Sequence, residues 1–380
     1  MTMTKRQMVM AVAAMAAGLA TAEPPEKTVL VDDCKAHSST GIVDRRASWK
    51  PAKPWHGFNL LGLFSPPWNK SDPRAMGFRE EQFQWLEEWG FNFARFPMDY
   101  RNFAATNDYF KLREEGFRLL DGAIAWGRKH HVHVQICLHR SPGFTIMSWD
   151  PEPIKLQTDP LAQKAFVNLW RVFAKRYRGI PNEELSFNLL NEPAGFSTEQ
   201  YVRVFGDAVL AIRKEDPNRF VMLDGNHVAS TPVKEFYSVR STGQAFRGYT
   251  PHAISHFGAW YIKDQPKKDP GWPMDPAVVD NRWIFEKPET TLEKFAKVVP
   301  KDYPVMIGEF GCYNKVSHET CLKWMEHCLK LWEEKNLGWA LWNLEGAFGI
   351  IDSDRSDTQY EDFHGRKLDR KMLDLLRRYK

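Results

Sequence analysis

The feature that most constrains the fold is a regular alternation of short apolar runs with longer amphipathic segments, which starts near Gly57 and continues to the last residues. Short apolar runs bounded by turn signals are typical of buried strands, and the segments between them have the spacing of amphipathic helices. Eight strand–helix pairs can be counted in the chain. Because no G-x-G-x-x-G follows the first run, the pattern predicts an α/β fold, a single closed (β/α)8 TIM barrel, and not an open doubly wound sheet.

The strands and the clearest helices can be placed on the chain. The strands are expected at Gly57 to Leu61, Phe91 to Phe96, Val132 to Leu138, Leu185 to Leu190, Phe220 to Leu223, Ala245 to Tyr249, Val305 to Gly308 and Gly338 to Trp342. The helices are expected at Phe78 to Trp89, Leu112 to Lys129, Pro160 to Tyr177, Thr198 to Glu215 and Glu319 to Lys335. A chain of 380 residues, 43% of them hydrophobic, can bury one large core. We therefore expect one domain at residues 55–380, preceded by an extension at 23–54.

The first 22 residues have the pattern of an export signal. Lys5 and Arg6 form a positive start, Met8 to Leu19 an apolar stretch, and Ala20 to Ala22 a small-x-small cleavage site. The apolar stretch is shorter than the ~20 residues that a membrane-spanning helix needs. We expect a signal peptide at 1–22 and an exported mature chain from Glu23, in the periplasm or outside the cell, with no membrane span.

Charge and cysteine content exclude several kinds of partner. The 52 basic and 48 acidic residues are spread along the chain with no run of one sign, so no nucleic-acid partner is expected. The five cysteines have neither the spacing of a zinc site nor an even count, so structural thiols are expected and the pairing of Cys34, Cys137, Cys312, Cys321 and Cys328 stays open. We expect a monomer without metal or cofactor.

The sharpest local signal is an apolar strand that ends in Asn191-Glu192-Pro193. Catalytic groups of a barrel project from the carboxyl ends of its strands, so Asn191 and Glu192 are candidates for chemistry. Pro193 predicts an extended backbone at Glu192. The structural alternative is that Glu192 and Pro193 only begin the next helix.

A second apolar run, from Val305, ends at Glu309 between two glycines. Two acids at the ends of different strands are costly to hold together unless they have a task. Glycoside hydrolysis needs such a pair, one carboxyl group protonated and the other ionised. Their mutual repulsion separates the two pKa values and so supplies both forms at one pH.

Other polar or aromatic side chains end further strands. Asn59, Arg95, His139 and Trp342 each lie at or near such an end. A cation can accompany a nucleophile, an imidazole or amide can bind sugar hydroxyls, and an indole can stack on a sugar face. The structural alternative for each is a salt bridge or ordinary core packing.

Taken in this order, the motifs resemble those of glycoside hydrolase family 5, the cellulase family among the retaining barrel glycosidases. The resemblance covers nearly all of the chain from Gly57 onward. It implies a double displacement in which Glu309 attacks the sugar and Glu192 is the general acid and base. It also implies that Asn191 binds the sugar 2-hydroxyl and that Arg95 orients Glu309.

One motif departs from the family pattern, which has His-x-Tyr near the end of the sixth strand. Arg247-Gly248-Tyr249 keeps the tyrosine and has arginine in place of histidine, whereas His256-Phe257-Gly258 keeps the histidine and loses the tyrosine. Tyr249 is the preferred candidate for this position, and His256 is the second.

The resemblance implies a polysaccharide or oligosaccharide substrate, with β-1,4-glucan first and β-mannan, xylan, xyloglucan or β-1,3-glucan as alternatives. A long irregular stretch from His252 to Thr290 carries Trp260, Tyr261, Trp272 and Trp283 and is expected at the active face. Exo action would require this stretch to block one end of the cleft.

Two other classes of function remain as alternatives. A non-catalytic carbohydrate-binding barrel could keep the aromatic residues, but it has no need of both acids. A metal-dependent hydrolase would draw its ligands from the histidines, but no H-x-H pair ends the first strand. Its candidate ligands are His56, His139, His227, His252 and His256.

Overall fold

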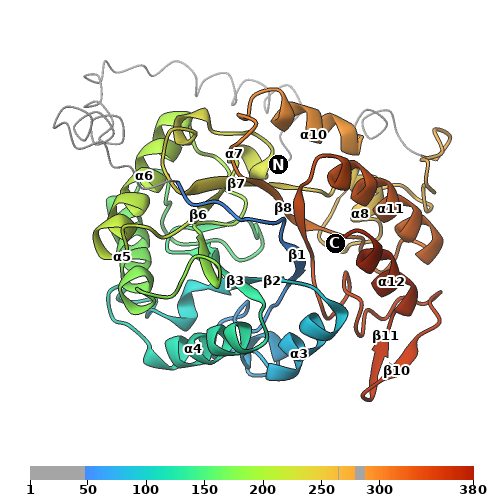
Figure 1. Cartoon of the computed structure of the whole chain (residues 1–380), viewed down its shortest axis with the longest axis horizontal. Helices are drawn as coiled ribbons and strands as arrows, with labels where there is room; N and C mark the ends of the chain where they lie inside the picture. The colour runs from blue at the N-terminus through green and yellow to red at the C-terminus, as the bar shows by residue number, and fades with distance from the viewer. Residues whose placement is uncertain (1–47, 264, 279–286) are drawn as a thin grey trace, which may run out of the picture. The chain divides into compact units, whose positions relative to one another are not determined.

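A computed structural model describes residues 48–263, 265–278 and 287–380 (Figure 1). In these residues eight parallel strands close into a ring, which confirms the predicted barrel. The predicted signal peptide and most of the extension lie outside the described residues. The barrel strands are β1 (His56–Asn59), β2 (Phe93–Asp99), β3 (His133–Ser141), β5 (Leu185–Asn188), β6 (Val221–Asp224), β7 (Thr242–Arg247), β8 (Val305–Phe310) and β9 (Gly338–Leu341).

Each barrel strand pairs in parallel with the strands before and after it in the chain, and the ring closes where β9 pairs with β1. Gly57 of β1 lies opposite Phe93 of β2 on one side and Ala340 of β9 on the other. The short strand β4 (Phe144–Thr145) pairs antiparallel with the end of β3. A hairpin of β10 (Glu361–Phe363) and β11 (Arg366–Leu368) lies outside the ring.

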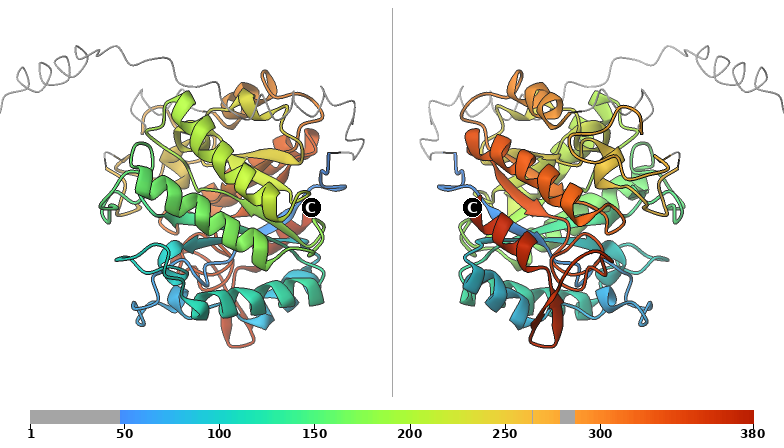
Figure 2. Two further views of the ribbon diagram at one scale, coloured as in Figure 1. Left: turned by 90° about the vertical axis from the view of Figure 1, so that its left-hand side faces the viewer. Right: turned by 90° about the vertical axis from the view of Figure 1, so that its right-hand side faces the viewer.

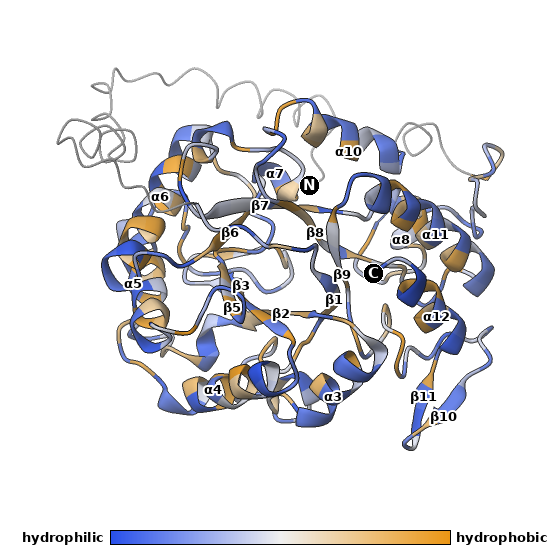
Figure 3. Cartoon of the chain, in the orientation of Figure 1, coloured by the Kyte–Doolittle hydropathy of each residue, from blue (hydrophilic) through white to orange (hydrophobic). Residues whose placement is uncertain are grey.

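Helices follow most of the strands and cover the ring with their apolar faces, whereas their hydrophilic faces point outward (Figure 3). α5 and α6 lie side by side on the outside of the barrel (Figure 2, left). The longer helices are α3 (Glu80–Trp89), α4 (Glu114–Lys129), α5 (Pro160–Arg176), α6 (Thr198–Glu215), α10 (Pro288–Ala296), α11 (His318–Glu334) and α12 (Arg370–Arg378), and the short ones are α7 (Asn226–Ala229) and α8 (His252–Ser255). No helix in the described part of the chain is long and apolar enough to cross a membrane.

Local sequence explains where several helices begin and end. Asp159 caps α5 by accepting from the backbone of Leu161, and Pro160 occupies the first turn, where no backbone donor is needed. Ser197 and Gln200 form a capping box at the start of α6. α3 ends at Gly90, which takes a left-handed φ of 77°.

The strand boundaries differ from the sequence predictions by a few residues. β5 ends at Asn188 and not at Leu190, and β7 spans Thr242–Arg247 where Ala245 to Tyr249 was predicted. Hydrophobicity marks burial, and the chain stays buried for several residues beyond the last ladder hydrogen bonds. Asn191 and Glu192 therefore lie on the loop just beyond β5, and Tyr249 lies just beyond β7.

The amino-terminal end of the barrel is closed by an apolar cluster. Trp55 stacks on Phe93 and on His133, with ring centroids 5.2 and 4.1 Å apart. The cluster consists of Trp55, Phe93, Phe220, Met222, Ala245, Met306 and Ala340. Because this end is filled, the opposite end is where a substrate can enter.

Candidate active site

A cleft of about 1050 Å³ opens at the carboxyl ends of the strands. It is lined by side chains from the ends of several different strands or from the loops that follow them, as expected for a barrel enzyme. Seven of the predicted site residues line it: Asn59, His139, Glu192, Tyr249, His256, Glu309 and Trp342. The other two, Arg95 and Asn191, are completely buried: Arg95 donates to Glu309 of the lining, and Asn191 accepts from Arg95 and Arg247.

Glu192 lies four residues beyond the end of β5. Its backbone has a φ of 46°, in the left-handed region, so the extended backbone predicted from Pro193 is wrong. The backbone N–H of Glu192 donates to Oδ2 of Asp224 on β6 at 2.9 Å. This hydrogen bond stabilises the left-handed backbone of Glu192 against the extended conformation that a following proline favours. The side chain is 14% exposed.

Glu309 lies inside β8, where its carboxylate is almost fully buried. Nη1 of Arg95 donates to Oε1 at 2.6 Å, and the hydroxyl of Tyr249 donates to Oε2 at 3.1 Å. Burial raises the pKa of Tyr249 well above its usual range, so its hydroxyl remains a donor. Both carboxylate oxygens are thus held in place by donors from β2 and from the loop after β7.

Arg95 forms the centre of the network beneath the cleft. Burial alone would lower the pKa of Arg95, but interactions with Cys137, Glu309 and Asp224 raise it above the ordinary value. Its guanidinium group donates to four side chains from three other strands or the loops after them: Asn59, Asn188, Asn191 and Glu309, at 2.6 to 2.9 Å. Removal of Arg95 would therefore leave several buried acceptors without a donor.

Arg247, the last residue of β7, lies between the two candidate acids. Its Nε donates to Oε1 of Glu192 at 3.0 Å, and its Nη2 lies 3.3 Å from Oε1 of Glu309. Nη2 also donates to Oδ1 of Asn191 at 2.7 Å and to Oδ2 of Asp224. Sequence analysis noted Arg247 only as a departure from a motif.

The surroundings of the two acids differ in a way that suits a proton donor beside a nucleophile. Burial raises the pKa of Glu192, and the negative charge of Glu309 adds to the rise, so that this pKa is about 7. Glu309 instead has two guanidinium groups within 3.3 Å of Oε1. Glu192 can therefore be protonated near neutral pH while positive charge compensates Glu309.

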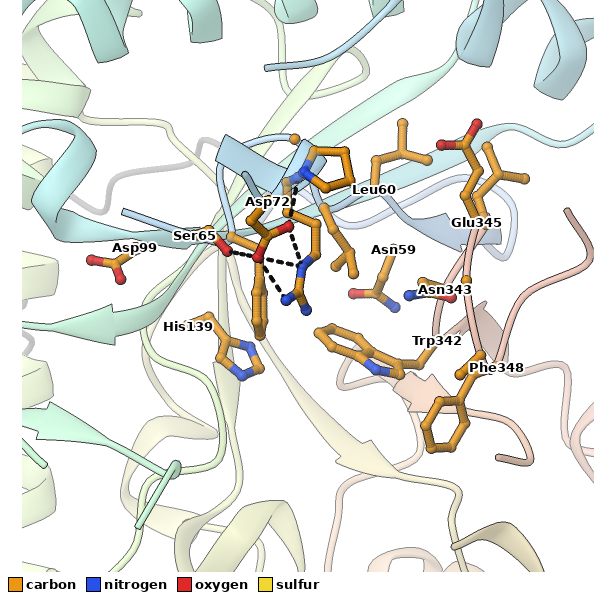
Figure 4. A pocket seen from close by; sticks show the side chains of 18 of the residues that line it. Asn59, Leu60, Ser65, Asp72, Asp99, His139, Trp342, Asn343, Glu345 and Phe348 are labelled. Atoms are coloured by element: carbon orange, nitrogen blue, oxygen red, sulfur yellow. Dashed lines mark hydrogen bonds and ion pairs between the residues drawn. The ribbon is translucent and has the colours of Figure 1, made fainter. Parts of the chain in front are cut away.

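Aromatic side chains form a floor in the cleft that the two acids also line (Figure 4 shows His139 and Trp342). His139 and Trp342 stack with ring centroids 5.4 Å apart, and Phe64 packs against both. Burial and then the charges of Arg95 and other arginines lower the pKa of His139 well below its usual range, so this imidazole is neutral. Next to this floor, Asp72 accepts from Ser65 and from the guanidinium group of Arg74, which lies over the ring of Phe64. The floor offers flat apolar faces with polar groups at their edges, which is the combination that a sugar ring needs.

The outer part of the cleft carries exposed aromatic rings. Trp260 is 72% exposed and Trp149 is 55% exposed, and their ring centroids are 5.3 Å apart. Tyr261 lies 5.8 Å from Trp149, and all three line the cleft. The predicted location of Trp260 and Tyr261 at this face is confirmed.

Other members of the predicted aromatic stretch have different places. Trp272 packs against His327 of α11 and does not line the cleft. Trp283 lies outside the described residues. His256 packs against Tyr249 with centroids 4.8 Å apart and binds Ser255 through Nδ1, so it is Tyr249 that contacts a candidate acid.

Asp224 is the main site residue that sequence analysis did not single out. It ends an apolar run, Phe220 to Leu223, in the same way as Glu309 does, so the signal was present. Its Oδ1 accepts from Asn188 at 3.1 Å, in addition to the two contacts of Oδ2 described above. Both oxygens of this fully buried carboxylate thus hold other site residues.

Two observations bear on metals and thiols. Within the described ranges, no three His, Cys, Asp or Glu side chains are grouped as ligands for a metal ion. Cys137, Cys312, Cys321 and Cys328 are buried free thiols, and Cys34 lies outside the described residues.

One polar atom of the site, Nδ2 of Asn191, has no hydrogen-bond partner among the described residues and so can donate to a ligand.

Comparison with known proteins agrees with this geometry. The cellulase family, glycosyl hydrolase family 5, matches residues 76–348. Endoglucanase C of Acetivibrio thermocellus is 26% identical over 310 residues, which are 74% of this chain and 88% of that one. A β-xylosidase of Phanerodontia chrysosporium is 30% identical over 313 residues, which are 76% of this chain and 62% of the relative. A solved structure described as that of a glycoside hydrolase is 32% identical, with a TM-score of 0.78 over 86% of this chain and 99% of that chain.

Proposed function

Because the chain belongs to glycosyl hydrolase family 5 and is a glycoside hydrolase, we propose that it cleaves β-linked glucan by double displacement, with Glu309 as nucleophile and Glu192 as acid and base. The observation that carries the proposal is the pair of acids in one cleft with unlike surroundings. Glu192 has a pKa raised by burial and by Glu309, and Glu309 is held by Arg95 and Tyr249.

In the first step, a carboxylate oxygen of Glu309 attacks the anomeric carbon while the bond to the leaving oxygen breaks. Glu192 gives its proton to that oxygen, so the leaving sugar departs as an alcohol. The products are a glycosyl ester of Glu309 and an ionised Glu192. Arg95 and Tyr249 hold the attacking carboxylate in position, which lowers the entropic cost of the step.

In the second step, the ionised Glu192 removes a proton from a water molecule, whose oxygen attacks the same anomeric carbon. The ester bond to Glu309 breaks, and both residues return to their first states. Two displacements at one carbon restore its configuration, so the product is a β-anomer.

We assign to the side chains around the acids the binding of the sugar residue whose anomeric carbon is attacked. The unpartnered Nδ2 of Asn191 is a donor for the 2-hydroxyl, and His139 with Trp342 offers a ring face and an edge. Trp149, Trp260 and Tyr261 supply apolar faces farther along the cleft. An open cleft with several aromatic faces suits a chain of sugars better than one residue.

A β-1,4-glucan is the first choice of polymer, since endoglucanases are among the relatives and residues from many loops line the cleft. A β-xylosidase is also among the relatives, and mannan, xyloglucan and β-1,3-glucan remain outcomes of the test. The test is release of reducing sugar from carboxymethyl-cellulose, β-glucan, glucomannan, xyloglucan and laminarin.

The roles of the two acids can be separated by chemical rescue. With an aryl cellobioside and sodium azide, Glu309→Ala should form the α-glycosyl azide, because azide takes the place of the nucleophile. Glu192→Ala should form the β-glycosyl azide, because azide takes the place of water. Exchanged anomers would reverse the assignment, and an intact protein that binds a polymer but cleaves none would favour the non-catalytic barrel.

Export is a separate proposal and rests on the sequence of residues 1–22. We expect the recovered protein to begin at Glu23 and to elute as a monomer. Amino-terminal sequencing and light scattering test these two expectations; a product that retains Met1 would contradict the first.

A further inference from the structure

Arg247 is buried beside the cleft, where it contacts both candidate acids and a third carboxylate. Its guanidinium group reaches Glu192, Glu309 and Asp224, which belong to three other strands or strand ends. The family pattern has a histidine at this position of the motif, so the arginine is a property of this chain. Its place beside Glu192 bears directly on the proton that Glu192 must donate.

The arginine is built into the site by two neighbouring residues. Asp224, fully buried on β6, accepts from Nη2 and so anchors one end of the guanidinium group. Gly308 on β8 leaves the space for the other end: a Cβ atom there would lie 2.7 Å from Nη1 of Arg247. Since Nη1 belongs to a group held by three carboxyl groups, it cannot move aside without loss of those contacts.

The two buried guanidinium groups, of Arg95 and Arg247, set the charge balance of the site. The carboxyl groups of Glu192, Glu309 and Asp224 would carry three negative charges if all were ionised, and Arg95 and Arg247 carry two positive charges. One proton among the three carboxyl groups makes the buried network neutral, which is its least costly state. The surroundings of Glu192 place that proton there.

We propose that Arg247, anchored by Asp224, is a positioning residue that keeps Oε1 of Glu192 as a hydrogen-bond acceptor and so confines the catalytic proton to Oε2. The proposal rests on the proposed function, since it assigns the proton-bearing atom of the general acid. A guanidinium group has five donors and no acceptor, so the oxygen that it contacts at 3.0 Å cannot present a proton to it. A neutral imidazole could accept that proton and would leave both oxygens available.

Burial and the charge of Glu309 raise the pKa of Glu192, and the same contact with Arg247 opposes that rise. The titratable or charged groups that face Glu192 come from β2, β6, β7, β8 and the loops after β7: Arg95, Asp224, Arg247, Glu309, Tyr249 and Tyr261. Among them Arg247 and Arg95 lower the pKa of Glu192, whereas Glu309 and Asp224 raise it. Removing the charge of Arg247 should therefore move the alkaline limit of activity upward, and removing that of Asp224 should move it downward.

The test compares Arg247→Gln, Arg247→Lys and Asp224→Asn with the parent enzyme. kcat/KM is measured from pH 5 to 9 on phenyl β-cellobioside, whose leaving group needs the acid, and on 2,4-dinitrophenyl β-cellobioside, whose leaving group does not. For Arg247→Gln we expect a loss of about 100-fold on the phenyl substrate, a loss within about tenfold on the dinitrophenyl substrate, and an alkaline limit about one pH unit higher. For Asp224→Asn we expect the limit to move lower.

Arg247→Lys keeps the charge but lacks the planar fork, so its alkaline limit should stay near that of the parent while the phenyl substrate still loses more than the dinitrophenyl one. This variant decides the question if Arg247→Gln does not fold, as judged by its melting temperature. Equal losses on both substrates with an unchanged alkaline limit would overturn the proposal. A parent enzyme that cleaves neither substrate nor any polymer, or whose activity on the phenyl substrate survives Glu192→Gln, would instead overturn the proposed function.

Discussion

The two ends of the barrel are made by the same eight strands but present opposite kinds of side chain. At the amino end, Trp55, Phe93 and their neighbours form an apolar cluster. At the carboxyl end, carboxyl and guanidinium groups form a buried charged network. On β2 the change occurs between Phe93 and Arg95, which face the same side because they are two residues apart. Stability and chemistry thus occupy successive layers of one interior, and each can be changed by its own substitutions.

The largest expected effect comes from the charged layer. Glu309→Gln keeps the volume and an acceptor for Arg95 but removes the nucleophile, so kcat on the best polymer should fall at least about 10³-fold. The melting temperature should change by only a few degrees. Activity assays and calorimetry on the same preparation measure kcat and the melting temperature. A variant that loses its fold together with its activity would show that the charged layer is needed for stability as well as for chemistry.

The next effect comes from the apolar layer. Trp55 is 8% exposed, so Trp55→Ala should lower the free energy of unfolding by about 3–5 kcal/mol through lost burial and an unfilled cavity. Below its melting temperature, the folded variant should keep kcat within about twofold. Urea unfolding measures the loss, and Trp149→Ala, at an exposed tryptophan, is the control expected to stay within about 0.5 kcal/mol.

A third effect depends on pH. Glu192 acts as an acid only when protonated, and its pKa is about 7, so kcat/KM should fall about tenfold per unit above that pH. Below pH 7 the protonated form dominates and this loss is absent. Initial rates on phenyl β-cellobioside from pH 5 to 9 check the slope, and a flat profile up to pH 9 would show that Glu192 is not the proton donor.

The smallest effect is expected at the rim. Trp260→Ala removes one exposed ring from the cleft and should raise KM for a polymer about fivefold, the value of about 1 kcal/mol of stacking. A short aryl glycoside that does not reach the rim should be cleaved as before. Trp272→Ala is the matched control from the same stretch, since Trp272 packs on His327 away from the cleft.

The barrel and the location of both acids at its carboxyl end could be predicted from the sequence, because an apolar run that ends in a carboxylate can be recognised without a structure. The sequence did not predict the left-handed backbone of Glu192, which depends on an acceptor from β6, a strand it does not belong to. The contacts of Asp224 and Arg247 were missed for the same reason, although the apolar run that ends at Asp224 is visible in the sequence. Which polar groups meet inside a barrel depends on the register of neighbouring strands, and strand boundaries from hydrophobicity are not fine enough to give it.

The absent side chain at Gly308 has a consequence for how this site can evolve. A methyl group there would collide with Nη1 of Arg247, so the two positions are not free to change independently. Replacement of the arginine by a smaller residue must come first, and only then can the glycine accept a side chain. In a mutational library, variants at position 308 should survive selection only in combination with a change at position 247. The order in which the two positions can change is therefore restricted.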